Sequence, residues 1–133
     1  MKTLVIGLGG TGKTTWVKRN LGDGLCFDLD ALAFAMRLEP YDAEKTRRIP
    51  DAIACANNFL TPFLDYTEFL ERDVFIIRTA PSIGELEVIE PERLIVCSRV
   101  YVNRGYGNEK AASLRIQRAI AWAKERFINV ECL

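Results

Sequence analysis

The stretch VIGLGGTGKTTW, residues 5–16, decides the fold because its character changes twice over a short distance. It begins within an apolar run, TLVIG at residues 3–7, whose β-branched side chains predict a buried parallel strand. It leads into residues 13–20, which contain no helix breaker and predict a helix. The glycines between the two predict a tight turn. A strand that passes through a short turn into a helix is the building unit of α/β proteins with a parallel sheet.

The glycine-rich turn also carries a chemical signal. Residues 7–14 match the phosphate-binding pattern G-x-x-x-x-G-K-[ST] at every fixed position, and they lie between a predicted strand and a predicted helix, as the pattern requires. Glycines let successive backbone N–H groups point at one anion, and the following helix adds the positive end of its dipole. We expect Lys13 to reach the β- and γ-phosphates and the Thr14 hydroxyl to bind magnesium. The alternative is a glycine-rich turn with a chance lysine.

The pattern therefore predicts a site for ATP, or another nucleoside triphosphate, together with Mg²⁺. The nucleotide-binding residues expected from it are Gly7, Leu8, Gly9, Gly10, Thr11, Gly12, Lys13, Thr14 and Thr15. No guanine-reading Asn-Lys-x-Asp motif is present, so the sequence does not predict a base preference.

Strands and helices are expected to alternate along the rest of the chain. The further predicted strands are residues 24–30, 73–80, 93–97 and 127–133, which are apolar runs. The further predicted helices are residues 31–38, residues 50–70, and a helix that follows Asn108 as its N-cap. Pro62 is expected to divide or kink the second of these, with Thr61 as an N-cap. Residues 82–92 are expected to form a short acidic connection.

The last helix has the clearest periodicity. Its predicted apolar stripe consists of Ile116, Ile120, Ala123 and Phe127, and its predicted opposite face carries Arg115, Arg118 and Arg126. The length of 133 residues predicts one domain, residues 1–133. Because the predicted strands are apolar throughout and alternate with helices, this domain is expected to be α/β, with a parallel sheet covered on both faces. In such sheets, ligands bind beyond the carboxyl ends of the strands.

The composition excludes several classes of protein. The 18 basic and 18 acidic residues give no net charge, so no global field indicates nucleic acid or a membrane. The chain has no histidine and no Cys-x-x-Cys pair, which argues against a zinc site. Cys26, Cys55, Cys97 and Cys132 are expected to be buried thiols, three of them in strands. With no signal-peptide pattern and no apolar run near the roughly 20 residues of a membrane span, the protein is expected to be cytoplasmic, without a membrane partner.

The segments GLGGTGKTTW and FDLDAL together resemble the P-loop NTPase superfamily, in its small kinase-like branch of shikimate, gluconate and polynucleotide 5′-hydroxyl kinases. The resemblance covers the whole chain as topology, but only the glycine-rich motif is specific. It implies a three-layer fold with a five-stranded parallel sheet in the order 2-3-1-4-5. It also implies ATP-dependent phosphotransfer to an acceptor that is a small molecule or a nucleic-acid 5′-hydroxyl.

Two aspartates follow the second predicted strand. Asp28 and Asp30 point to the same face if that strand extends through both, whereas Asp30 becomes the N-cap of the next helix if the strand ends at Asp28. The resemblance implies that Asp28 supports the metal ion and that Asp30 is the catalytic base. It also implies that Lys13 is a catalytic residue. Which aspartate has which role stays open.

The third predicted strand ends in IIRTA, and Arg78 occupies the place near its end where many P-loop ATPases have an acid. This departure argues against an AAA-type ATPase more than against a kinase, since some small kinases use the second-strand aspartate instead. Arg78 is expected either to contact a phosphate or carboxylate of the substrate, or to be a solvent-facing or ion-paired arginine.

The resemblance implies that residues 99–108 form a short lid after the fourth strand. Arg99 and Arg104 would then stabilise the charge of phosphoryl transfer, and Gly105 and Gly107 would act as hinges. The alternative is a solvated basic loop. Cations and tyrosines in the wider region 99–126 also suit single-stranded nucleic acid, although a solvated cationic helix face is the blander explanation.

The acceptor side is expected between the second and third strands. The polar residues there are Arg37, Arg47, Arg48, Asn57 and Asn58, and no substrate can be inferred from them. Two functions remain in competition: a kinase-like phosphotransferase, and a nucleotide-binding accessory or regulatory module that hydrolyses ATP slowly or not at all. Acceptor-stimulated release of ADP would distinguish them.

Overall fold

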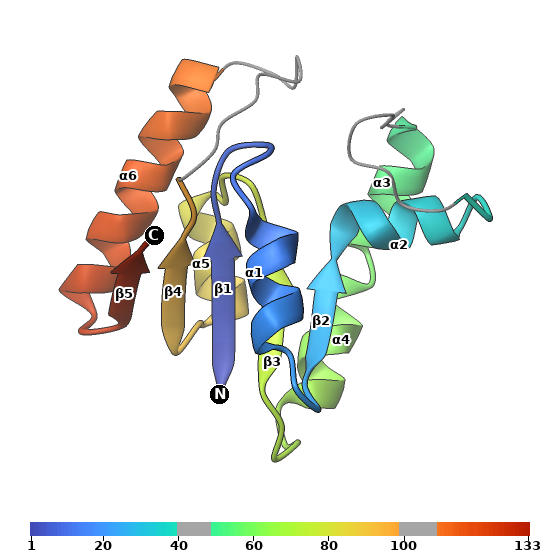
Figure 1. The fold of residues 1–133 in the computed structure, drawn as a ribbon, viewed down its shortest axis with the longest axis horizontal. Coiled ribbons are helices and arrows are strands. Elements are labelled where there is room, and N and C mark those ends of the chain that lie inside the picture. Colours follow the sequence, from blue (N-terminus) through green and yellow to red (C-terminus); the bar gives the residue numbers. More distant parts are fainter. Residues whose placement is uncertain (40–48, 99–108) are drawn as a thin grey trace.

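The computed structural model describes residues 1–39, 49–98 and 109–133 (Figure 1). Five parallel strands form one sheet in the order β2-β3-β1-β4-β5, which confirms the expected α/β class and strand order. The strands are β1 (Lys2–Ile6), β2 (Leu25–Asp28), β3 (Val74–Ile77), β4 (Arg93–Val96) and β5 (Asn129–Cys132). The helices are α1 (Lys13–Asn20), α2 (Leu29–Ala35), α3 (Pro50–Asn57), α4 (Leu60–Thr67), α5 (Ile83–Ile89) and α6 (Glu109–Glu125).

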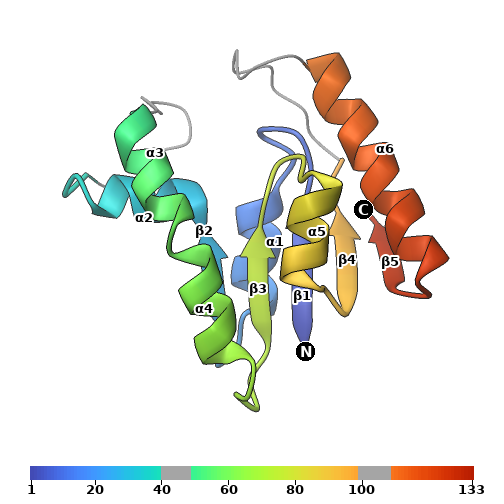
Figure 2. The ribbon, with the colours of Figure 1, turned by 180° about the vertical axis from the view of Figure 1, so that it is seen from behind.

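Helices cover both faces of the sheet. In Figure 1, α1 lies in front of the sheet and α5 behind it, and Figure 2 shows α4 and α5 from the other side. The larger core lies on the face covered by α4, α5 and α6, where Leu4, Ile76 and Leu94 are fully buried against Leu86 and Trp122. The smaller core lies under α1. The central strands are buried on both faces, as expected of strands that are apolar throughout.

The parallel register brings several chain segments to one edge of the sheet. Residues 7–12, the glycine loop, connect the carboxyl end of β1 to α1, and α2 begins at the carboxyl end of β2 (Figure 1). Asp28 pairs with Ile77 across β2 and β3, and Val5 pairs with Ile77 across β1 and β3. The glycine loop, Asp28 and Arg78 therefore lie at the ends of three adjacent strands.

The strand β2 does not extend through both Asp28 and Asp30, which was the first of the two alternatives for these aspartates. The strand ends at Asp28, so Asp28 and Asp30 do not share the face of one extended strand. Nor is Asp30 the N-cap: Asp28 occupies that position and accepts a hydrogen bond from Ala31 N, and Asp30 lies in the first turn. The helix begins earlier than expected because the cap is Asp28.

Two other helix predictions were incomplete. Residues 82–92 contain α5, which begins at the N-cap Ser82, whose hydroxyl accepts a bond from Glu85 N. The segment 50–70 does form two helices, but Thr61 lies inside α4, and the N-cap position is Phe59, without a side-chain cap bond. Pro50, the first residue of α3, takes the favourable first-turn position.

The predicted apolar stripe of α6 is wrong at its last member. Ala123 is buried and Ile116 and Ile120 pack against the core, but Phe127 follows the end of the helix and is 97% exposed. The cysteine prediction is also only partly right: all four lie in the described residues as free thiols, but only Cys97 is fully buried, and Cys55 and Cys132 are exposed. Among the helices of the described residues, none has the length and apolarity needed to cross a membrane.

Candidate functional site

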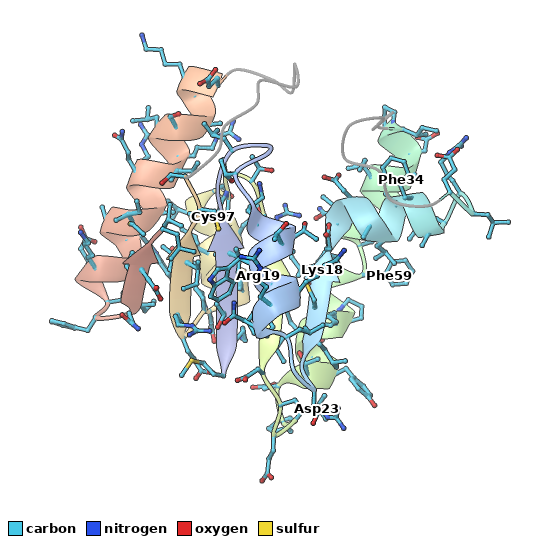
Figure 3. All side chains as sticks on the ribbon, in the orientation of Figure 1. Lys18, Arg19, Asp23, Phe34, Phe59 and Cys97 are labelled. Carbon is cyan, nitrogen blue, oxygen red and sulfur yellow. The ribbon has the colours of Figure 1, made fainter. Side chains whose placement is uncertain are left out.

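The glycine loop has a backbone conformation with positive φ angles, which residues with a Cβ adopt only with strain. Gly7, Gly10 and Gly12 have φ angles of 154°, 81° and 91°. A Cβ added at Gly7 would lie 2.4 Å from the carbonyl oxygen of Cys97, which is labelled in Figure 3 beside the base of the loop. Gly12, in the left-handed conformation, is the N-cap of α1 and makes no side-chain cap bond. Glycine is therefore required where the loop approaches β4 and where it turns into the helix.

Lys13 is the first residue of α1, and its side chain folds back over the loop. The Lys13 Nζ donates to the carbonyl oxygens of Gly7 at 2.7 Å and of Leu8 at 3.0 Å. The Thr11 hydroxyl donates to the same Leu8 oxygen at 2.7 Å. The ammonium group thus lies against two carbonyl oxygens of the loop, and its positive charge would attract an anion bound there.

Thr14 and Asp28 come together from different elements. The Thr14 hydroxyl on α1 lies 3.5 Å from Asp28 Oδ2 at the end of β2, and Asp28 Oδ1 accepts from Ala31 N at 3.3 Å. Burial raises the pKa of the Asp28 carboxyl, and the nearby charge of Asp30 raises it further, whereas the hydrogen bonds from Ala31, Asp30 and Thr14 lower it. A partly desolvated carboxylate beside a hydroxyl is suited to a cation.

Cys26 lies near this carboxylate in the same strand. Burial, followed by the charge of Asp28, raises the pKa of the Cys26 thiol to about 12. The thiol is therefore neutral at physiological pH and acts as a small packing group in the core under α1.

Arg78 has a specific set of partners at the end of β3. Its Nε and one terminal nitrogen both donate to Glu85 Oε2 of α5, at 3.0 and 2.6 Å, and its other terminal nitrogen donates to Asn57 Oδ1 of α3 at 3.1 Å. The Arg78 side chain is only 14% exposed. The ion-paired alternative for Arg78 is thus the one observed. Glu85 was missed from the sequence because residues 82–92 did not suggest a helix.

The remaining predicted site residues are divided between described and undescribed parts of the chain. Arg47, Arg48, Arg99 and Arg104 lie outside the described residues, as does the predicted lid at 99–108. Arg37 is exposed and pairs with Glu39 at 3.3 Å. Asn58 is the C-cap of α3. Thr15 is exposed on α1, as are Lys18 and Arg19, which Figure 3 labels.

The cations predicted as a nucleic-acid surface are only partly described. Arg115 and Arg118 are exposed along α6, and Arg126 follows its end, with its guanidinium 4.3 Å from the centre of the Trp122 ring. Tyr101 and Tyr106 lie outside the described residues. The nucleic-acid surface stays a prediction.

Side chains that could bind a metal ion are few at this edge among the described residues. Within residues 1–39, 49–98 and 109–133, no group of three or more His, Cys, Asp and Glu could hold a metal ion. Thr14 and Asp28 together offer a hydroxyl and a carboxylate, a donor set that fits Mg²⁺ when phosphate oxygens and water complete the octahedron.

Comparison with known proteins adds no assignment. No protein-family model matches the chain, and a search of curated proteins finds no significant relative.

Proposed function

We propose that the protein binds MgATP at the glycine loop and transfers the γ-phosphoryl group to a hydroxyl acceptor, as a P-loop kinase does. One observation carries the proposal: the glycine loop caps α1, the Lys13 ammonium lies against its carbonyl oxygens, and the Thr14 hydroxyl lies beside the Asp28 carboxylate. These groups supply backbone donors, a positive charge and a hard oxygen pair to a polyphosphate and its metal.

The two aspartates differ in position, and this supports a division of roles. Asp28 lies beside Thr14 and is fixed by its cap bond to Ala31, so it would support the magnesium ion, the role expected for it. Asp30 lies in the first turn of α2, two residues farther along, and we assign it the catalytic base. Magnesium, when bound, neutralises charge on the phosphates.

Transfer of the γ-phosphoryl group forms one bond and breaks one bond, and Asp30 takes up the proton that the acceptor loses. The acceptor hydroxyl oxygen forms a bond to the γ-phosphorus while the bond from that phosphorus to the β,γ-bridging oxygen breaks. The acceptor proton passes to the Asp30 carboxylate, and ADP leaves with the bridging oxygen and its electron pair. Lys13 and the loop amides hold the phosphates in line for the attack.

The test is release of ADP from MgATP in the presence of separate acceptor pools. One pool contains hydroxyl-bearing small molecules and the other contains oligonucleotides with a 5′-hydroxyl. We expect one pool to accelerate ADP release, and Asp30→Asn to reduce the acceleration by roughly 10²- to 10⁴-fold, the usual contribution of general-base catalysis. If the protein binds the nucleotide tightly but no acceptor accelerates the release of ADP, the result would contradict phosphotransfer and favour the accessory or regulatory module.

A further inference from the structure

We propose that exposed aromatic side chains on α4 and the turn after it form a docking surface for a basic amphipathic helix of another protein. The surface consists of Phe59, Tyr66 and Phe69, called the aromatic stripe from here on. The exposed fractions of these residues are 49%, 76% and 86%. The aromatic stripe shares no residue with the glycine loop, so the inference adds a protein partner to the proposed nucleotide binding.

The three rings lie along one side of a helix. Tyr66 follows Phe59 after two helical turns, with Phe63 between them at the spacing that keeps all three on one side. The C-cap Glu68 keeps right-handed helical dihedral angles, so Phe69 continues this side after Tyr66. In the view of Figure 3, the labelled Phe59 lies beyond the edge strand β2, on the side away from β3. The aromatic stripe therefore follows the outer flank of α4.

A different face of α4 already holds the helix on the sheet. Leu60, Leu64 and Thr67 are buried, and the Phe63 ring packs against Phe27 of β2 with 5.6 Å between the ring centres. The aromatic stripe is mostly exposed and contributes little to this packing. It leaves on the order of 400 Å² of aromatic surface in water, as large as the patches that mark interaction sites on monomeric proteins.

The neighbouring edge strand adds further apolar surface. Leu25 lies two residues before Phe27 in β2, so both point to the face of the sheet that α4 covers, and Leu25 is 36% exposed. Among the described strands, β2 pairs with β3 alone. A helix packed along the outer flank of α4 would extend the layer that α4 and α5 form on this face (Figure 2).

The charges around the aromatic stripe indicate the kind of partner. Residues 59–71 contain Asp65, Glu68 and Glu71 and no basic residue. The three carboxylates are exposed, and none forms an ion pair within residues 1–39, 49–98 and 109–133. Opposite charges across an interface favour encounter and fix orientation. An amphipathic helix with Lys and Arg beside its apolar face therefore complements this surface in both shape and charge.

The same carboxylates disfavour two other occupants. In a two-fold dimer through the aromatic stripe, the acidic residues of one copy would lie near those of the other. An anionic lipid surface would also meet these residues with like charge. A basic helix is the occupant whose charge is complementary, and the two alternatives are measured beside it.

The probe is a synthetic amphipathic helix of about 18 residues, with leucine on one side and lysine on the other, compared with the same peptide carrying glutamate in place of lysine. Each peptide is titrated into the ¹⁵N-labelled chain and followed by NMR at the backbone amides of residues 59–71. The test variant is Tyr66→Ser/Phe69→Ser. The matched control is Phe127→Ser, because Phe127 is an exposed ring after α6, which packs beside β5 at the other edge of the sheet. Urea unfolding checks that each variant is folded.

We expect the lysine peptide to shift these amides saturably in wild type and in Phe127→Ser, and to bind Tyr66→Ser/Phe69→Ser at least about tenfold more weakly. Asp65→Asn/Glu68→Gln should weaken binding by about threefold, a difference that high salt removes. Equal binding of the glutamate peptide, or shifts located away from residues 59–71, would overturn the inference.

Sedimentation equilibrium and vesicle binding test the other occupants. We expect wild type to be monomeric and not to bind phosphatidylglycerol vesicles. Dimerisation that Tyr66→Ser/Phe69→Ser abolishes would assign the aromatic stripe to a second copy of the chain and overturn the inference. Vesicle binding that the same variant loses would assign it to a membrane surface, with the same consequence.

Discussion

At the scale of single residues, the site depends on an aspartate that performs two tasks. Asp28 caps α2 through Ala31 N and lies beside the Thr14 hydroxyl, and burial raises the pKa of its carboxyl. The ionised form therefore costs stability in the folded protein. Such a cost is expected where a carboxylate is kept for a ligand rather than for the fold.

The first prediction concerns Asp28→Asn. Because the folded-state pKa of Asp28 lies above the ordinary value of 3.8, the folded chain binds more protons than the unfolded chain between these two values. Stability should therefore fall as pH rises through that window and stay lower above it. Asparagine is neutral and caps helices equally well. We expect Asp28→Asn to have the higher free energy of unfolding at pH 7, with an advantage that shrinks towards pH 4.

Urea unfolding at several pH values measures this difference, and MgATP binding is measured beside it. The control is Asp51→Asn, which replaces an exposed aspartate in the first turn of α3. We expect no comparable gain there, and we expect Asp28→Asn to weaken Mg²⁺-dependent binding of ATP. An Asp28→Asn variant that is less stable at pH 7 would show that the carboxylate charge supports the fold.

At the scale of elements, two helices end in an unusual way. After α6, Ile128 N donates to Ala123 O and Phe127 N donates to Lys124 O, and after α2 the same pattern is centred on Leu38. This is the Schellman arrangement, whose left-handed residue is usually glycine. Here it is Phe127 and Leu38, both with φ of 57° and both more than 90% exposed.

The second prediction follows from the end of α6. Phe127 has a backbone conformation that costs roughly 1 kcal/mol for a side chain with a Cβ, and its exposed ring contributes no burial in return. Phe127→Gly should raise the free energy of unfolding by about 0.5–1 kcal/mol, seen as a higher urea midpoint at constant slope. Phe127→Ala keeps the Cβ and should change stability by less than about 0.5 kcal/mol. Equal gains in both variants would contradict the strain argument.

The third prediction concerns the start of the glycine loop. In Gly7→Ala the new methyl group would lie 2.4 Å from Cys97 O and 2.6 Å from Thr11 Oγ1. One contact is with backbone, so the loop must move, and we expect a loss of at least about 2 kcal/mol in thermal or urea unfolding. Gly22→Ala is the matched control, because φ is +51° there and nothing lies within 4 Å of the new Cβ. Its expected cost is about 1 kcal/mol. Similar losses at the two glycines would exclude the proposed clash.

The same elements show what could be predicted from the sequence. The first strand, the glycine turn and α1 were predicted almost to the residue, because the hydrophobic run, the glycines and the helix formers all indicate the same structure. The start of α2 was not, since both aspartates can cap a helix and only tertiary geometry selects Asp28. Helix α5 was missed because a short helix in an acidic segment is stabilised by burial of Leu86 and Ile89, which local propensity does not reveal.

At the scale of the whole molecule, the strand order brings the site together. Strand β3 lies between β1 and β2, so the glycine loop and the aspartates are separated by one strand, and Arg78 directly follows that strand. Apolar strands separated by helical segments made the parallel sheet predictable, although the helix between β3 and β4 was missed. The Arg78–Glu85–Asn57 cluster was not predictable, because its members come from β3's end, α5 and α3 and meet only in the folded chain.

The central claim is that the glycine loop binds a nucleotide triphosphate through Lys13. It is tested most directly by calorimetric titration of ATP, with and without Mg²⁺, into wild type, Lys13→Ala and the control Lys18→Ala. Lys18 is an exposed lysine near the other end of the same helix. A charged hydrogen bond to phosphate contributes about 1.5–3 kcal/mol, so we expect Lys13→Ala to weaken binding by roughly 10- to 100-fold or more and Lys18→Ala to bind as wild type does. Equal ATP affinity in a folded Lys13→Ala variant, or no ATP binding by wild type, would contradict the account.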